Sequence, residues 1–191
     1  MLDFAKLKLK RGPQVILPKD AGMIAAYSGV GHGDTVVDVG AGSGWLAVFL
    51  GNVVGEKGKV VSYERRPEFA DLAEKNVRKA GLEGIVEIKR KDAFEGIDEK
   101  DADLVTLDLG DSQLLLEKAA AAAKAGGMIV GYLPNVEQAK DFVMEAERLG
   151  LAHEKTIECI VREMLIREKG CRPENTGLTH TSYLSFLRKR I

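Results

Sequence analysis

Three glycines, Gly40, Gly42 and Gly44, alternate with small residues directly after an apolar run at residues 36–39. A largely apolar stretch with the character of a helix follows them. A strand that opens through such a turn into a helix brings bare backbone amides to the helix N-terminus, where no Cβ atom blocks a nucleotide. The sequence therefore predicts a nucleotide-like cofactor at this turn.

The spacing of these glycines distinguishes between cofactors. A dinucleotide fingerprint, G-x-G-x-x-G, requires a third glycine at position 45, where this chain has Trp45. The observed G-x-G-x-G spacing, with Asp38 inside the preceding strand, resembles the first motif of class I S-adenosylmethionine (SAM) methyltransferases. We therefore expect Gly40, Gly42 and Gly44 to contact SAM.

Acidic side chains follow the neighbouring strands of the predicted sheet. Glu64 closes the strand expected at 59–63, and Asp92 follows the next one. In doubly wound nucleotide-binding folds an acid at the end of the second strand binds the ribose hydroxyls, so we expect both carboxylates at the cofactor. Asp108 lies at the end of the fourth strand. Its carboxylate could act on a methyl acceptor, or it could cap the following helix.

The remaining sequence alternates between strand and helix patterns, and Gly126 and Gly127 end an alanine-rich helix. Alternation of this kind indicates a parallel sheet, and two consecutive terminal strands indicate an antiparallel end. We expect one doubly wound, Rossmann-like α/β domain over residues 1–191, with an N-terminal segment and helix over 1–30 and an antiparallel C-terminal hairpin over 152–191. The predicted strands are 35–39, 59–63, 85–89, 103–109, 128–133, 156–167 and 179–188; the predicted helices are 20–30, 45–52, 66–80, 114–124 and 136–149.

Charge is balanced overall but clustered locally. The 191 residues include 28 basic and 29 acidic side chains, for a net charge of −1, so no global basic excess indicates nucleic-acid binding. A polyanion would therefore bind to a local cluster, although each run taken alone is more simply a solvated surface. The basic clusters are Lys6, Lys8, Lys10 and Arg11 near the start, residues 89–91, and residues 188–190.

Cysteine and histidine are too sparse for a metal site or a disulfide framework. Cys159 and Cys171 are distant in sequence from each other, and the three histidines are scattered, so we predict no metal. Whether the cysteines pair between chains is left open. No apolar stretch is long enough to span a membrane, and no secretion signal begins the chain, so we expect a cytoplasmic protein.

Two further segments carry a more specific resemblance. Residues 11–20, RGPQVILPKD, and residues 171–183, CRPENTGLTHTSY, resemble an N-terminal loop and a C-terminal hairpin of the TrmI family of tRNA (adenine-N1)-methyltransferases. The resemblance implies methylation of N1 of a T-loop adenine, with SAM as cofactor and Asp108 as the catalytic carboxylate. It implies cofactor contacts from Gln14, Gly40, Gly42, Ser43, Gly44, Glu64, Asp92 and Asp108, and tRNA contacts from Lys6, Lys8, Lys10, Arg11, Arg172 and His180.

The chain also departs from the family pattern. Family members usually carry an N-terminal β-rich domain that helps to grip tRNA, and this chain begins almost at the resembling loop. After the fourth strand the family has Asp-Leu/Met-Pro-x-Pro, whereas this chain reads Asp108-Leu109-Gly110-Asp111-Ser112. Leu17 stands where the family often has histidine or tyrosine. These changes predict an altered pocket for the target base.

Two other functions stay open. A small-molecule SAM methyltransferase, such as a precorrin enzyme, would suit the short N-terminus, although the basic start argues mildly against it. A non-catalytic tRNA-binding subunit would not need the intact glycine turn with Glu64 and Asp92. The terminal strands carry apolar side chains that one small sheet would leave uncovered, which predicts a dimer or tetramer. Those side chains include Ile157, Ile160, Met164, Tyr183 and Phe186.

Overall fold

A computed structural model describes residues 7–12 and 14–191. These residues form a seven-stranded sheet in the order β3-β2-β1-β4-β5-β9-β6, in which β9 runs antiparallel to its neighbours β5 and β6. The doubly wound order and the antiparallel C-terminal end confirm the predicted fold class. The strands are β1 (Thr35–Val39), β2 (Lys59–Tyr63), β3 (Val86–Lys89), β4 (Ala102–Leu107), β5 (Ala123–Leu133), β6 (Ala152–Glu158) and β9 (Tyr183–Arg188).

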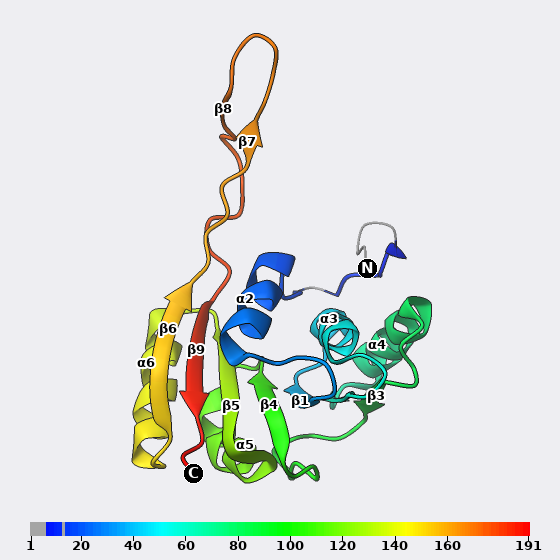
Figure 1. Ribbon diagram of the computed structural model, residues 1–191, viewed down its shortest axis with the longest axis vertical. Coiled ribbons are helices and arrows are strands. Elements are labelled where there is room, and N and C mark those ends of the chain that lie inside the picture. The colour runs from blue at the N-terminus through cyan, green and yellow to red at the C-terminus, as the bar shows by residue number, and fades with distance from the viewer. Residues whose placement is uncertain (1–6, 13) are drawn as a thin grey trace.

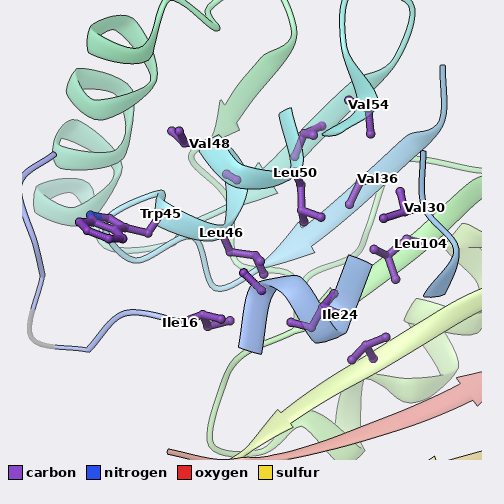
Figure 2. Packing of buried hydrophobic residues seen from close by; sticks show 14 of the residues in the cluster. Ile16, Ile24, Val30, Val36, Trp45, Leu46, Val48, Leu50, Val54 and Leu104 are labelled. Atoms are coloured by element: carbon purple, nitrogen blue, oxygen red, sulfur yellow. The ribbon is translucent and has the colours of Figure 1, made fainter. Parts of the chain in front are cut away.

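Helices cover both faces of the sheet (Figure 1). Along β1, Val36 and Val37 are both fully buried but belong to different cores, because successive side chains of a strand point to opposite faces. Figure 2 shows Leu50 beside Val36 and Ile24 close to Leu46, all within one of these two cores. One face carries α2 (Pro18–Ser28), α3 (Trp45–Val54) and α4 (Pro67–Ala80), and the other carries α5 (Leu116–Ala122) and α6 (Val136–Arg148). Within the described chain, none of the helices has the length and apolar character needed to cross a bilayer.

The alanine-rich segment after β4 differs from its prediction as a helix over 114–124. A short 3-10 helix, η1 (Ser112–Leu115), precedes α5, and the chain has already entered β5 at Ala123. Gly126 and Gly127 therefore lie inside a strand and do not end a helix. A Cβ atom on Gly127 would come within 2.9 Å of the carbonyl oxygen of Ala102, so this pairing with β4 needs a glycine.

The C-terminal strands are shorter than predicted, because sheet neighbours support only part of each segment. β9 lies between β5 and β6 and buries Leu184 and Phe186 on one face and Leu187 on the other. Residues 159–182, here called the arm, extend away from the body (Figure 1). Their only ladder within the described chain is β7 (Met164–Leu165) paired with β8 (Arg172–Pro173). The continuous strands predicted at 156–167 and 179–188 are therefore interrupted by the arm.

Candidate active site

A cavity of about 410 Å³ opens at the carboxyl ends of the parallel strands. The strand order reverses between β1 and β4, and in open α/β sheets ligands bind in the crevice at such a reversal. The fold thus brings together residues that are distant in sequence. Predicted site residues that line the cavity are Gln14, Gly40, Gly42, Ser43, Glu64, Asp92 and Asp108.

Gly40 allows β1 and β4 to end side by side. Its φ is 98°, and a Cβ atom there would overlap the carbonyl oxygen of Asp108. The amides of Gly40 and Ala41 both donate to the carbonyl of Tyr63, at 3.0 and 2.9 Å. The turn is therefore fixed against the ends of β2 and β4 at once, which leaves no room for a larger residue.

Glu64 is held at the cavity by the glycine turn. Its Oε2 accepts a hydrogen bond from the amide of Gly42 at 2.9 Å, and its Oε1 accepts from the backbone amide and Nε of Arg66 at 3.0 and 3.1 Å. Glu64 is only 4% exposed. A carboxylate fixed in this way beside the turn can receive hydroxyl donors from a ligand.

Gly44 has a different role from the other two glycines. It lies outside the cavity lining and is the N-cap of α3, with φ 75°. A Cβ atom there would come within 3.0 Å of the Cβ of Ala73 in α4. The structure thus places Gly44 at the contact between two helices, directly behind the glycine turn, and its predicted contact with SAM stays a prediction.

Ser43 provides a polar group without a partner at the cavity. The residue is 2% exposed, and no described residue hydrogen-bonds its buried Oγ. Buried hydroxyls in folded proteins normally have a partner. An unpaired hydroxyl in the wall of a cavity is therefore suited to bind a polar group of a ligand.

Asp92 also lines the cavity and is well supported. Its Oδ1 accepts from the amide of Phe94 at 3.0 Å, and its Oδ2 lies 3.3 Å from a guanidinium nitrogen of Arg65. The loop that follows is tied back to β3 by Lys89, whose Nζ lies 2.7 Å from Glu99 Oε1. These contacts fix the wall that carries Asp92 and the exposed ring of Phe94.

Asp108 is half-buried and directly follows β4, where its amide donates to the carbonyl of Val39 at 2.9 Å. Burial, together with the nearby carboxylates of Asp38 and Glu64, raises the pKa of Asp108 to about 7. The N-cap of η1 is Asp111, so Asp108 does not cap the following helix. Asp108 lines the cavity, and its carboxyl group has a proton affinity in the range useful for neutral-pH chemistry.

Asp38 supports the site from beneath. It is 1% exposed and accepts hydrogen bonds from Ser62 Oγ at 2.6 Å and Thr106 Oγ1 at 2.7 Å, one from each neighbouring strand. Burial raises the pKa of Asp38 above its ordinary value, although these two hydrogen bonds oppose the shift. Asp38 therefore links β1 to β2 and β4 immediately below the glycine turn.

The predicted tRNA contacts are not brought together in one place. Lys8, Lys10 and Arg11 lie in the N-terminal segment beside α4, and Lys6 lies outside the described residues (Figure 1). Arg172 belongs to β8 in the arm. His180 is at the base of the arm, where its ring nitrogens lie 2.6 Å from Glu158 Oε1 and 2.8 Å from the carbonyl oxygen of Pro134.

Sequence reasoning missed two residues that shape the cavity. Gln138 of α6 donates from Nε2 to the carbonyl of Gly110 at 3.0 Å and so holds the loop after Asp108. Asn76 of α4 is 2% exposed and binds the backbone beside the glycine turn. The sequence does carry a signal for Asn76, because this polar residue falls on the apolar face of the helix, next to Val77 and one turn after Ala73.

Comparison with known proteins identifies the relatives of this chain. The family described as tRNA methyltransferase complex GCD14 subunit matches residues 3–182. The tRNA (adenine(57)-N(1)/adenine(58)-N(1))-methyltransferase TrmI of Methanocaldococcus jannaschii is 39% identical, over 98% of this chain and 76% of that protein.

Solved structures agree in fold. A SAM-dependent O-methyltransferase from Thermotoga maritima superposes with a TM-score of 0.92 at 35% identity, covering 97% of this chain and 70% of that one. The tRNA (m1A58) methyltransferase TrmI from Aquifex aeolicus superposes with a TM-score of 0.86 at 27% identity, covering 95% and 72%. The match thus extends along nearly the whole chain and about three quarters of each relative.

Proposed function

The chain belongs to the TrmI family of tRNA methyltransferases, and we propose that it transfers a methyl group from SAM to N1 of a T-loop adenine in tRNA. The observation that carries this proposal is the position of Asp108. Asp108 lines the same cavity as the glycine turn, and its backbone is packed against Gly40. A carboxylate and a cofactor turn that share one cavity suit transfer between two bound molecules.

The cavity fits SAM in the groups that it presents. Glu64 would receive the ribose hydroxyls, and Asp92 would bind the adenine of the cofactor, to which Phe94 and Leu109 offer apolar surface. The unpaired Oγ of Ser43 would bind the polar methionine end. When bound, SAM supplies a methyl group activated on a cationic sulfonium. The protein then has to position the acceptor in line and stabilise charge.

Asp108 would stabilise the methyl acceptor. Methylation at N1 leaves the adenine ring cationic, and a carboxylate that accepts a hydrogen bond from the exocyclic amine favours that charge or removes a proton. The pKa of about 7 keeps a large fraction of Asp108 ionised at neutral pH. The burial that raises this pKa also strengthens the interaction of the ionised form with a cationic ring.

The loop after Asp108 shapes the pocket for the target base. Gly110 adds no side chain to the pocket wall, and a Cβ atom at this position would have no neighbouring atom within 4 Å. Leu17, the N-cap of α2, likewise offers no aromatic ring. We infer that the base is held less firmly than by a proline-rich loop, and that specificity for the modified position is altered.

The tRNA would contact surfaces on both sides of the cavity, in the cytoplasm where the substrate occurs. The basic N-terminal residues would supply phosphate contacts, and the arm would approach the tRNA through Arg172 and His180. A T-loop adenine is buried in the tRNA elbow, so it would have to be extruded at a cost of a few kcal/mol, about the value for base flipping. Phosphate and arm contacts would offset this cost. The proposed N-terminal contacts are Lys6, Lys8, Lys10 and Arg11.

The arm favours an assembly with further copies of this chain. An isolated two-stranded ribbon is marginal in water, and large exposed apolar side chains on one element indicate a partner. We therefore propose a homo-oligomer in which the arm packs against a second copy. The apolar arm residues that are more than half exposed are Ile160, Val161, Met164, Ile166 and Leu178. Three other residues that were predicted to be uncovered are not: Ile157 and Tyr183 are partly buried, and Phe186 is fully buried.

Incubation with labelled SAM and unmodified tRNA, followed by nucleoside analysis, tests the proposed activity. The expected product is 1-methyladenosine. A protein that binds SAM, leaves tRNA unmodified and methylates a small tetrapyrrole would instead be a small-molecule methyltransferase. A protein that binds tRNA without binding SAM would be a non-catalytic subunit.

Light scattering tests the proposed assembly. The wild-type chain should have a mass of at least two copies, and the variant Ile160→Ser with Ile166→Ser should lose part of it. A monomeric wild type at micromolar concentration would contradict the assembly without affecting the proposed chemistry.

A further inference from the structure

Asn76 lies in α4 and does not line the cavity, yet its side chain joins two segments that do. Its Oδ1 accepts from the amide of Lys10 at 3.0 Å, and its Nδ2 donates to the carbonyl of Lys10 at 2.8 Å. The same Nδ2 donates to the carbonyl of Ser43 at 2.8 Å. One side-chain amide thus links the N-terminal segment to the glycine turn.

The contact with Lys10 has the form of a strand pairing. An amide side chain carries the same donor and acceptor groups as a peptide unit, so Asn76 pairs with both backbone groups of Lys10 as a neighbouring strand would. Asparagine is unfavourable within a helix, and burial of its amide costs free energy unless the hydrogen bonds are made. The helix therefore loses intrinsic stability at Asn76, and the three hydrogen bonds offset that loss.

A second side chain fixes the same point of the backbone. Trp45, the first residue of α3, donates from Nε1 to the carbonyl of Lys10 at 3.2 Å, and the Arg11 guanidinium lies 4.9 Å from the Trp45 ring centroid. Figure 2 shows Trp45 on the side of α3 that faces α4 and the N-terminal segment. Residue 10 is thus held by two helices, four residues before Gln14 reaches the cavity.

The contact with Ser43 acts on the glycine turn. Ser43 lies between two glycines that have positive φ, a stretch with high backbone freedom. A hydrogen bond to its carbonyl restricts that freedom and so helps to fix Ser43, a residue of the cavity lining whose Oγ is buried and unpaired. Asn76 therefore ties the segment that leads to Gln14 to the glycine turn.

We propose that Asn76 is a positioning residue for SAM binding, which preorganises the glycine turn and the Gln14 segment before the cofactor enters. The inference rests on the proposed placement of SAM in this cavity. Asn76 touches neither the cavity nor Asp108, so it acts on cofactor affinity and leaves the transfer step itself unchanged. Preorganised contacts raise affinity because less ordering remains to be done on binding.

The test compares Asn76→Ala and Asn76→Asp with the wild type and with Asn52→Ala, a control on the exposed side of α3. Asn76→Asp keeps the shape and the acceptor for the Lys10 amide but loses both donations from Nδ2. Calorimetry should show a Kd for SAM raised about tenfold in both Asn76 variants, which corresponds to about 1.4 kcal/mol of lost preorganisation. KM for SAM should rise with it, whereas kcat at saturating SAM and the Kd for tRNA should stay within about twofold.

Hydrogen exchange separates this role from a general loss of folding. The amide of Lys10 should exchange faster in Asn76→Ala, with no change in the amides of β1 and β4. In the wild type, added SAM should slow exchange at Lys10. If the wild type binds SAM and both Asn76 variants bind it with the same Kd, the inference is wrong. It is also wrong if kcat falls in the variants while KM for SAM is unchanged. If the wild type itself fails to bind SAM, the proposed cofactor site is wrong.

Discussion

Gly40 and Asp108 are in direct backbone contact, so that any Cβ atom on Gly40 would overlap the carbonyl oxygen of Asp108. Two residues later the situation is different, because a Cβ atom on Gly42 would meet no protein atom nearer than 3.9 Å and would stand at the cavity. The first glycine therefore serves the fold and places the carboxylate. The second leaves space for a ligand.

Alanine substitutions should separate these two roles. Gly40→Ala should displace the end of β4 and unfold the protein or strongly destabilise it. Gly42→Ala should fold with a loss of about 1–2 kcal/mol for the positive φ and should weaken SAM binding, because the new methyl group enters the cavity. Urea unfolding and calorimetry measure the two effects. The control is Gly22→Ala in α2, where the Cβ atom meets open space; this variant should be more stable than wild type by about 1 kcal/mol. Equal stability of the Gly40 and Gly42 variants would contradict the separate roles given to these two glycines.

Asp108→Asn should lower methyl transfer by about 10²-fold while SAM binding remains nearly intact, because the shape is kept and the charge is lost. The wild-type rate should rise with pH through about 7, the pKa to which burial and the neighbouring carboxylates raise Asp108. The variant should lack this rise. A wild-type rate that is flat between pH 5 and pH 9, measured with saturating substrates, would exclude Asp108 as the titrating group.

Asp108→Asn, which should lower activity, should raise the free energy of unfolding relative to wild type as the pH rises. A raised pKa means that the folded protein binds the Asp108 proton more tightly than the unfolded chain does. This contribution to stability is present below the ordinary pKa of 3.8 and is lost as the pH rises through about 7. The Asp108→Asn variant has no carboxyl group to titrate and carries no such loss. Its stability relative to wild type should therefore grow over this range and then level off, as urea unfolding at pH 4, 6 and 8 can measure.

The residues of the cavity wall could be predicted from the sequence because their signals are local. The glycine spacing, and the acids Glu64 and Asp92 after their strands, follow from strand ends that meet at one edge of a parallel sheet. Gly44 could not be assigned in the same way, because its role depends on Ala73 in another helix. Asn76 was missed for the same reason, since its partners lie 66 and 33 residues away in the chain.

The errors in the fold also arise from long-range pairing. An alanine-rich segment has high helix propensity, but Ala123 pairs with Ala102 in β4, and that tertiary contact decides the structure. The arm reads as continuous strand because its residue types favour β structure. Whether a strand continues depends on neighbouring strands, and within residues 159–182 the described chain supplies only the short β7–β8 ladder.

A buried polar network joins α2 to the base of the arm. Asp20 is fully buried; its Oδ1 lies 2.7 Å from Lys19 Nζ, and its Oδ2 accepts from Thr181 Oγ1 at 2.9 Å. Lys19 Nζ also donates to the carbonyl of Cys159 and to Thr181 Oγ1, both at 2.6 Å. Both ends of the arm are thus fixed to the helix that follows the N-terminal segment.

Thr181→Val should loosen this attachment. The change keeps the shape but removes one donor and one acceptor from a buried ion pair, and the expected loss of unfolding free energy is about 1–3 kcal/mol. Hydrogen exchange in the arm should increase. The control is Thr179→Val on the exposed part of the arm; if both variants behave alike, the network does not anchor the arm.

Neutralising the basic N-terminal residues should weaken tRNA binding through charge alone. The side chains of Lys8 and Lys10 are exposed, whereas their backbone carbonyls are held by Lys79 and Asn76, so Lys8→Ala with Lys10→Ala should leave the segment in place. Each lost phosphate contact makes the slope of log K against log salt less steep by about 0.7–0.9. The double variant should therefore lose roughly twice that value, and its Kd for SAM should be unchanged. Lys140→Ala in α6, on the other face of the sheet, is the control and should keep the wild-type slope. An unchanged salt dependence in the double variant would show that tRNA does not contact this segment.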